Sequence, residues 1–107
     1  MNYDELEAGY ELDALVAEKV MGLVKGSFGW INSDTAIPIA LPLYSTDIAA
    51  AWEVVERFKD WDWKLYSHGE GESFVIYKDG THYEATAPTA PLAICRAALK
   101  AVTGSKA

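Results

Sequence analysis

The sequence is poor in cysteine and has no long apolar run. Cys95 is the only cysteine among 107 residues, which excludes an internal disulfide and fits a reducing compartment. The longest apolar stretches fall far short of the roughly 20 residues that a membrane-spanning helix needs. The first residues are acidic and lack the positive start of a secretory signal. We therefore expect a soluble intracellular protein with no membrane partner.

Basic residues are also scarce. The chain has nine Lys and Arg against 16 Asp and Glu, for a formal net charge of −7. A protein that binds a nucleic-acid duplex neutralises phosphates with a basic face, so we expect no duplex nucleic acid partner. A small anionic ligand stays open, because a local pocket can be positive on an acidic protein.

Acidic residues gather before the first cation, Lys19. Such a run is typical of a solvated helix face. The alternative is a docking surface for a basic partner. The residues are Asp4, Glu5, Glu7, Glu11, Asp13 and Glu18.

The side chains that metal sites and catalytic centres require do not cluster in the sequence. His68 and His82 stand 14 residues apart, too isolated for a structural metal site. Cys95 falls on an apolar helical stripe, which favours a small buried hydrophobe over a nucleophile. No pair of carboxylates has an apolar setting that would tune it for acid–base work. We expect no catalytic residues, no metal and no cofactor.

Hydrophobic residues make up 50% of the chain, enough for one core, so residues 1–103 are predicted to form a single domain with a tail at 104–107. Apolar spacings of three and four predict three helices. The first covers residues near 5–23. The second covers residues near 46–59, with Ser45 as its N-cap. The third begins at the N-cap Thr89 and ends at Thr103 and Gly104. The expected buried stripe of the second helix is Ile48, Trp52, Val55 and Phe58.

Alternating apolar residues predict strands near 63–66, 73–77 and 82–86. Asp79 and Gly80 between the last two are a strong signal for a tight hairpin. The stretch 25–43 is read as irregular, with an optional short edge strand at 37–41 where proline is tolerated. The predicted class is α/β (α+β): an antiparallel three-stranded meander packed by three helices.

The starts of the second and third predicted helices are the most specific candidate binding sites. Helix N-termini present unpaired N–H groups that bind anions, and aromatic faces can stack on a nucleobase. Arg96 could add positive charge at the rim. The alternative reading is ordinary helix capping and aromatic packing with no ligand. The candidate ligand-binding residues are Tyr44, Ser45, Thr46, Trp30, Trp61, Thr86, Thr89 and Arg96.

Three blocks of the chain, residues 16–22, 42–56 and 87–99, resemble the phage ABA-sandwich domain family of bacteriophage and prophage proteins. The blocks follow the family's order and span nearly the whole chain, whereas residues 26–40 depart from it. The resemblance implies an α-β-α sandwich with helices on both faces of a sheet. It implies no general enzymatic activity.

These observations favour a non-enzymatic phage protein in the host bacterial cytoplasm that antagonises defence by sequestering a small anionic nucleotide. A homo-oligomer could build the pocket across its interface. One alternative is a protein–protein inhibitor or adaptor acting through the acidic first helix. A structural or assembly accessory protein of the phage and a hydrolase of a signal nucleotide are the others.

Overall fold

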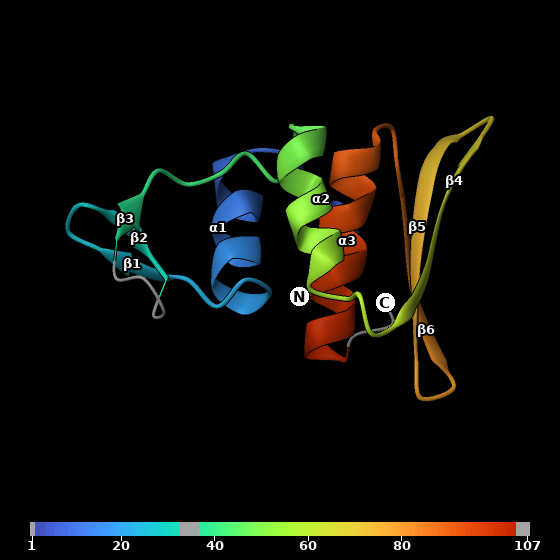
Figure 1. Cartoon of the computed structure of the whole chain (residues 1–107). Helices are drawn as coiled ribbons and strands as arrows, with labels where there is room; N and C mark the ends of the chain where they lie inside the picture. The colour runs from blue at the N-terminus through green and yellow to red at the C-terminus, as the bar shows by residue number, and fades with distance from the viewer. Residues whose placement is uncertain (1, 33–36, 105–107) are drawn as a thin grey trace.

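The computed structural model describes residues 2–32 and 37–104. Four layers follow one another in Figure 1: a small sheet, α1, the pair α2 and α3, and a larger sheet. In chain order the elements are η1 (Tyr3–Glu5), α1 (Tyr10–Lys19), β1 (Val24–Gly26), β2 (Gly29–Ile31), β3 (Pro38–Ile39), α2 (Ile48–Glu56), β4 (Asp62–His68), β5 (Gly71–Lys78), β6 (Thr81–Ala87) and α3 (Ala90–Thr103).

The central element is α3, which contacts α1, α2, η1, β5 and β6. Most of its residues are buried, and small side chains let neighbouring helices and the sheet approach closely. Its N-cap is Thr89 and its C-cap is Gly104 in the left-handed conformation, as the sequence predicts. Residues 105–107 of the predicted tail lie outside the described residues. The buried alanines are Ala93, Ala97, Ala98 and Ala101.

The predicted meander is confirmed as the antiparallel sheet β4–β5–β6, with longer strands than expected. Asp79 and Gly80 both have positive φ, at 50° and 80°, as a type I′ hairpin requires. The inner face of the sheet buries Phe74, Ile76 and Ala85. With three helices beside two antiparallel sheets, the α+β class is confirmed.

The described helices all lie on one side of the meander, and its other face points away from them (Figure 1). No described helix covers that outer face in Figure 1, whereas the resemblance implies helices on both faces of a sheet. Tyr66 and Tyr77 on this face are 45% and 41% exposed.

The stretch read as irregular forms a second antiparallel sheet, β1–β2–β3. Pro38 stands in the outermost strand, where an edge strand was expected. Gly29 has φ 136°, and a Cβ there would lie 2.7 Å from the carbonyl oxygen of Ile39, so only glycine allows this pairing. Strands of two and three residues are too short to show alternation, and for this reason the sheet was missed.

The first helix starts later than predicted, at Tyr10 rather than near residue 5. Residues 3–5 form the separate η1, and Gly9 at φ 147° turns the chain into α1. None of the described helices is long and apolar enough to cross a membrane.

The predicted cap and stripe of α2 need correction. Its N-cap is Asp47, whose Oδ1 accepts a hydrogen bond from the Ala49 amide at 3.1 Å. Ile48 and Trp52 are 44% and 40% exposed. The helix instead turns its small face toward the closely packed α3, where a tryptophan would not fit. Its buried residues are Ala50, Ala51, Val54 and Val55, followed by Phe58, and of these Val55 and Phe58 belong to the predicted stripe.

Candidate functional site

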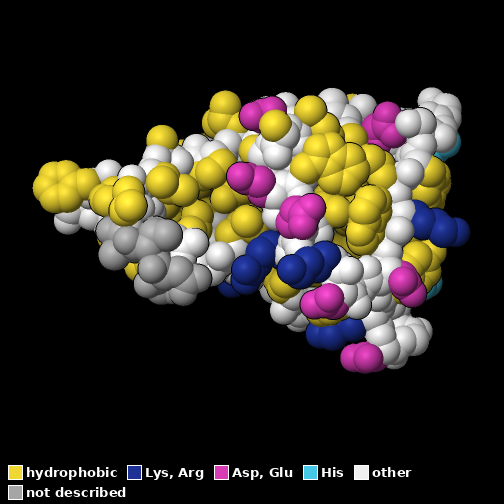
Figure 2. All heavy atoms as spheres, in the orientation of Figure 1, with side chains coloured by type: hydrophobic (Ala, Val, Ile, Leu, Met, Phe, Trp, Pro, Cys, Tyr) yellow, Lys and Arg dark blue, Asp and Glu magenta, His cyan; other side chains and the backbone are white. Residues whose placement is uncertain are grey.

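A groove lies between the small sheet, the end of α1 and α2. Its volume is about 430 Å³, and we call it the candidate groove. Figure 2 shows hydrophobic side chains gathered over the small-sheet end, with acidic and basic side chains beside them over the middle of the molecule. The lining residues are Met21, Leu23, Asn32, Ile37, Ile39, Pro42, Tyr44, Glu53 and Arg57.

Arg57 is the cation of the candidate groove. It is the C-cap of α2, one helical turn after Glu53. Its Nε donates a hydrogen bond to the Val20 carbonyl oxygen at 3.3 Å, which ties the side chain to the end of α1. The terminal guanidinium nitrogens make no hydrogen bond to any residue that the structure describes. They are therefore available to an anionic group in the groove.

Tyr44 is a buried polar group of the groove and is 2% exposed. Burial, and next the charge of Glu53, raise the pKa of its phenol to about 12. The phenol therefore stays protonated at neutral pH, where its hydroxyl can donate a hydrogen bond.

We predict that Tyr44 is a late-titrating tyrosine. In an alkaline titration followed by phenolate absorbance, Tyr44→Phe should remove a phenol that ionises near pH 12, above the ordinary value of 10. Because the folded pKa is raised, the stability from the neutral phenol is present below pH 10 and lost as the pH rises toward 12. Tyr10→Phe, at a side chain 59% exposed, is the control. Loss of a phenol with the ordinary pKa from Tyr44→Phe would contradict the assignment.

The two predicted helix starts lie at the same end of the molecule, because α2 and α3 run in the same direction (Figure 1). Thr46 and Thr89 are exposed there. Ser45 is fully buried and is already bonded: its Oγ accepts from the Gly9 amide at 3.0 Å, and its own amide donates to Asp13 Oδ1 at 2.8 Å. Ser45 therefore fixes the chain before α2 and is no exposed ligand group.

Arg96 was expected to add positive charge at the rim, but its guanidinium is bonded within the fold. Its Nε and Nη2 donate to the Leu6 carbonyl at 3.0 and 2.7 Å, and its Nη1 donates to the Thr86 carbonyl at 3.4 Å. The Thr86 hydroxyl pairs with Ser73 Oγ at 2.7 Å. These side chains bind the segment after η1 and the end of β6 to the core.

The two candidate stacking tryptophans are far apart in the fold. Trp30 is 7% exposed within β2. Trp61 follows the other end of α2, packs on Phe58 with ring centroids 5.0 Å apart, and has Lys78 Nζ 4.4 Å from its ring centre. The structure brings neither of them to the helix starts.

Of the predicted site residues, the groove contains only Tyr44. Sequence reasoning missed Glu53 and Arg57 as site residues, although their spacing of four placed them together on a helix. No pattern could have revealed the apolar wall, because it joins residues that follow α1, residues in and beside β3, and Pro42.

The buried cysteine agrees with its interpretation as a hydrophobe. Cys95 is fully buried, and burial, followed by the charge of Asp13, raises the pKa of its thiol. Among the described residues there is no group of three or more side chains suited to hold a metal ion.

The acidic segment divides into internal and exposed groups. Asp4 pairs with Lys100 at 2.7 Å, and Asp13 is 1% exposed. Glu5, Glu7 and Glu11 line a separate hollow of about 450 Å³. These three carboxylates and the exposed Glu18 thus remain available to a basic partner.

The chain matches the family model described as the phage ABA sandwich domain over residues 14–99. This range contains every residue that lines the candidate groove. A phage protein from Bacillus cereus ATCC 14579, solved as a crystal structure at 2.0 Å, is similar with a TM-score of 0.76 and 29% identity. The match covers 89% of this chain and 92% of that one. None of the curated proteins compared with the chain matches it.

Proposed function

Since the chain belongs to the phage ABA sandwich domain family, we propose that it is a non-enzymatic phage protein that sequesters a nucleotide-type signal of host defence. It would act in the host bacterial cytoplasm and hold the ligand in the candidate groove. The observation that carries the proposal is that Arg57, tied by its Nε to the Val20 carbonyl, lines a groove whose other lining residues are mostly apolar.

The groove offers a distinct contact to each part of a nucleotide. Its aliphatic side chains suit one face of a base, and Arg57 suits a phosphate. Glu53 can accept hydrogen bonds from ribose hydroxyls, and the protonated Tyr44 can donate one. The volume of about 430 Å³ falls within the range of roughly 300–1,000 Å³ that is usual for small-molecule sites.

The polar groups of the groove suit holding a ligand better than converting it. A phenol with a pKa near 12 is poorly matched to proton transfer at neutral pH. An arginine stays charged throughout and exchanges no proton. Binding without turnover is therefore the activity that Tyr44 and Arg57 support.

Calorimetry against cyclic nucleotides and ADP-ribose derivatives tests the binding. We expect at least one ligand with a Kd below about 10 µM, or about −7 kcal/mol. Arg57→Ala should weaken that Kd by roughly tenfold or more, because a charge-assisted hydrogen bond is lost. Lys59→Ala, at an exposed cation two residues away that does not line the groove, should leave the Kd unchanged. Absence of any binding below about 10 µM would contradict the proposal.

Recovery of the ligand distinguishes a sequestering protein from an enzyme. After incubation and denaturation of the complex, chromatography should return the ligand intact and in stoichiometric amount. A converted product that accumulates with time would overturn the non-enzymatic assignment.

A second candidate function is an adaptor that docks its acidic segment on a basic host protein. The hollow that Glu5, Glu7 and Glu11 line favours it. Changing these three to glutamine spares Asp4 and Asp13, which hold internal contacts. Partner recovery from host lysate should then fall, whereas Glu70→Gln in the exposed β4–β5 turn should not change it. Equal recovery by both variants would exclude this function.

A further inference from the structure

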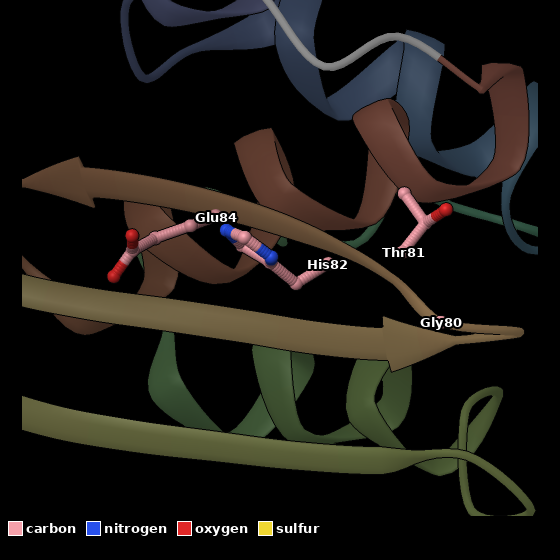
Figure 3. A pocket seen from close by; sticks show the side chains of 4 residues that line it. All are labelled: Gly80, Thr81, His82 and Glu84. Carbon is pink, nitrogen blue, oxygen red and sulfur yellow. The ribbon is translucent and has the colours of Figure 1, made fainter.

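The outer face of the meander carries an exposed hollow of about 530 Å³. Figure 3 looks onto this face: His82 and Glu84 lie on the near side of β6, and the helices lie behind the sheet. We define the outer face by the residues that line the hollow. They are Lys64, Tyr66, Val75, Tyr77, His82 and Glu84.

Strand register arranges charges on this face in rows across the three strands. One row runs Lys64, Val75, Glu84, with a cation on β4 and an acid on β6. The next row runs Asp62, Tyr77, His82, with an acid on β4 and an imidazole on β6. The first row therefore has opposite charges at its two ends, and both rows have an apolar or aromatic centre.

Such rows are complementary to themselves. A two-fold axis parallel to β5, lying against the outer face, exchanges the β4 side with the β6 side. Lys64 then faces Glu84 of the second copy, and Val75 faces its own counterpart. An axis across the strands would instead bring Lys64 against Lys64, so the charges select the first arrangement.

We propose that the outer face is a homodimer interface with a two-fold axis parallel to β5. Sheets that pack face to face stand about 10 Å apart, a distance that a lysine and a glutamate can span together. The Tyr66 hydroxyl donates to Glu84 Oε2, which holds that carboxylate over the face. Exposed tyrosines at the centre and edge of the face supply amphipathic contact area, as is common at interfaces.

This interface is independent of the candidate groove. The groove lies among the small sheet, α1 and α2, on the opposite side of α3 from the meander (Figure 1). A dimer would keep both grooves open. If the protein proves to be a monomer, the proposal of ligand binding is therefore unaffected. If it binds no ligand, the proposal of a dimer is likewise unaffected.

Sedimentation velocity of the full chain tests the interface. We expect a species of twice the chain mass of 11.7 kDa. Lys64→Glu and Glu84→Lys should each raise the dimer Kd by roughly tenfold or more, because like charges then meet across the axis. The double variant should restore the dimer, since it exchanges the two charges. Lys19→Glu, an exposed cation on α1, is the control.

Two results would overturn the inference. One is that the unaltered chain remains a monomer at all concentrations up to about 100 µM. The free energy of dimer formation would then be weaker than about −5.5 kcal/mol. The other is a dimer that both single charge reversals leave intact. Circular dichroism of each variant checks that the fold is retained.

Discussion

Replacing Phe74 with alanine is expected to destabilise the protein by about 3–5 kcal/mol. Phe74 stands in the middle of β5, is fully buried, and has its ring centroid 5.6 Å from that of Trp63. Its ring fills the space between the meander and α3, where truncation would leave a cavity. A domain of this kind has a total stability of about 5–15 kcal/mol, so the loss would be a large part of it.

Phe28→Ala is the matched control, because it deletes the same atoms where they are 90% exposed. We expect this change to stay within about 0.5 kcal/mol. Urea unfolding followed by tryptophan fluorescence measures both variants. Similar losses at the two positions would contradict the described core.

Replacing Asp13 with alanine is expected to cost about 2–3 kcal/mol of unfolding free energy. Asp13 is 1% exposed, and its Oδ1 accepts the Ser45 amide at 2.8 Å. Ser45 Oγ in turn accepts the Gly9 amide at 3.0 Å. Removing the carboxylate leaves a buried N–H without its acceptor and loosens the join between α1 and the chain before α2.

Two further variants make the Asp13 prediction specific. Asp13→Asn keeps an oxygen for the Ser45 amide and should cost clearly less than alanine. Glu11→Ala, at an exposed acid on the same helix, should stay within about 0.5 kcal/mol. If asparagine and alanine cost the same, the hydrogen bond to Ser45 is not what stabilises this join.

The parts of the fold that could be predicted depend on local chemistry. Asp79 and Gly80 favour positive φ by themselves, which sets the β5–β6 hairpin whatever surrounds it. Likewise, Thr89 and Gly104 bound α3 through the backbone preferences of a helix start and end.

The parts that could not be predicted depend on contacts between distant segments. Ser45 was read as a cap because a hydroxyl before a helix commonly caps it, but its Oγ instead accepts the amide of Gly9, 36 residues earlier. Arg96 was read as free charge, but the Leu6 carbonyl, 90 residues earlier, accepts its hydrogen bonds. Composition and spacing carry no information on such pairings.

The candidate groove was hidden for the same reason. Its apolar wall joins segments that are distant in sequence, from Met21 to Pro42, and its cation was read only as part of a helix surface. Tyr44 was identified for a different reason, its place before a helix. Tyr44 and Arg57 are 13 residues apart in sequence, and the structure brings them into the same groove.

The central claim is that the groove holds a small ligand without converting it. Native mass spectrometry of the protein purified from infected, defence-activated cells tests this directly. The claim predicts an added mass of a few hundred daltons on the unaltered chain, lost in Arg57→Ala, and released intact on denaturation. The bare chain mass for both proteins, or release of a cleaved product, would contradict it.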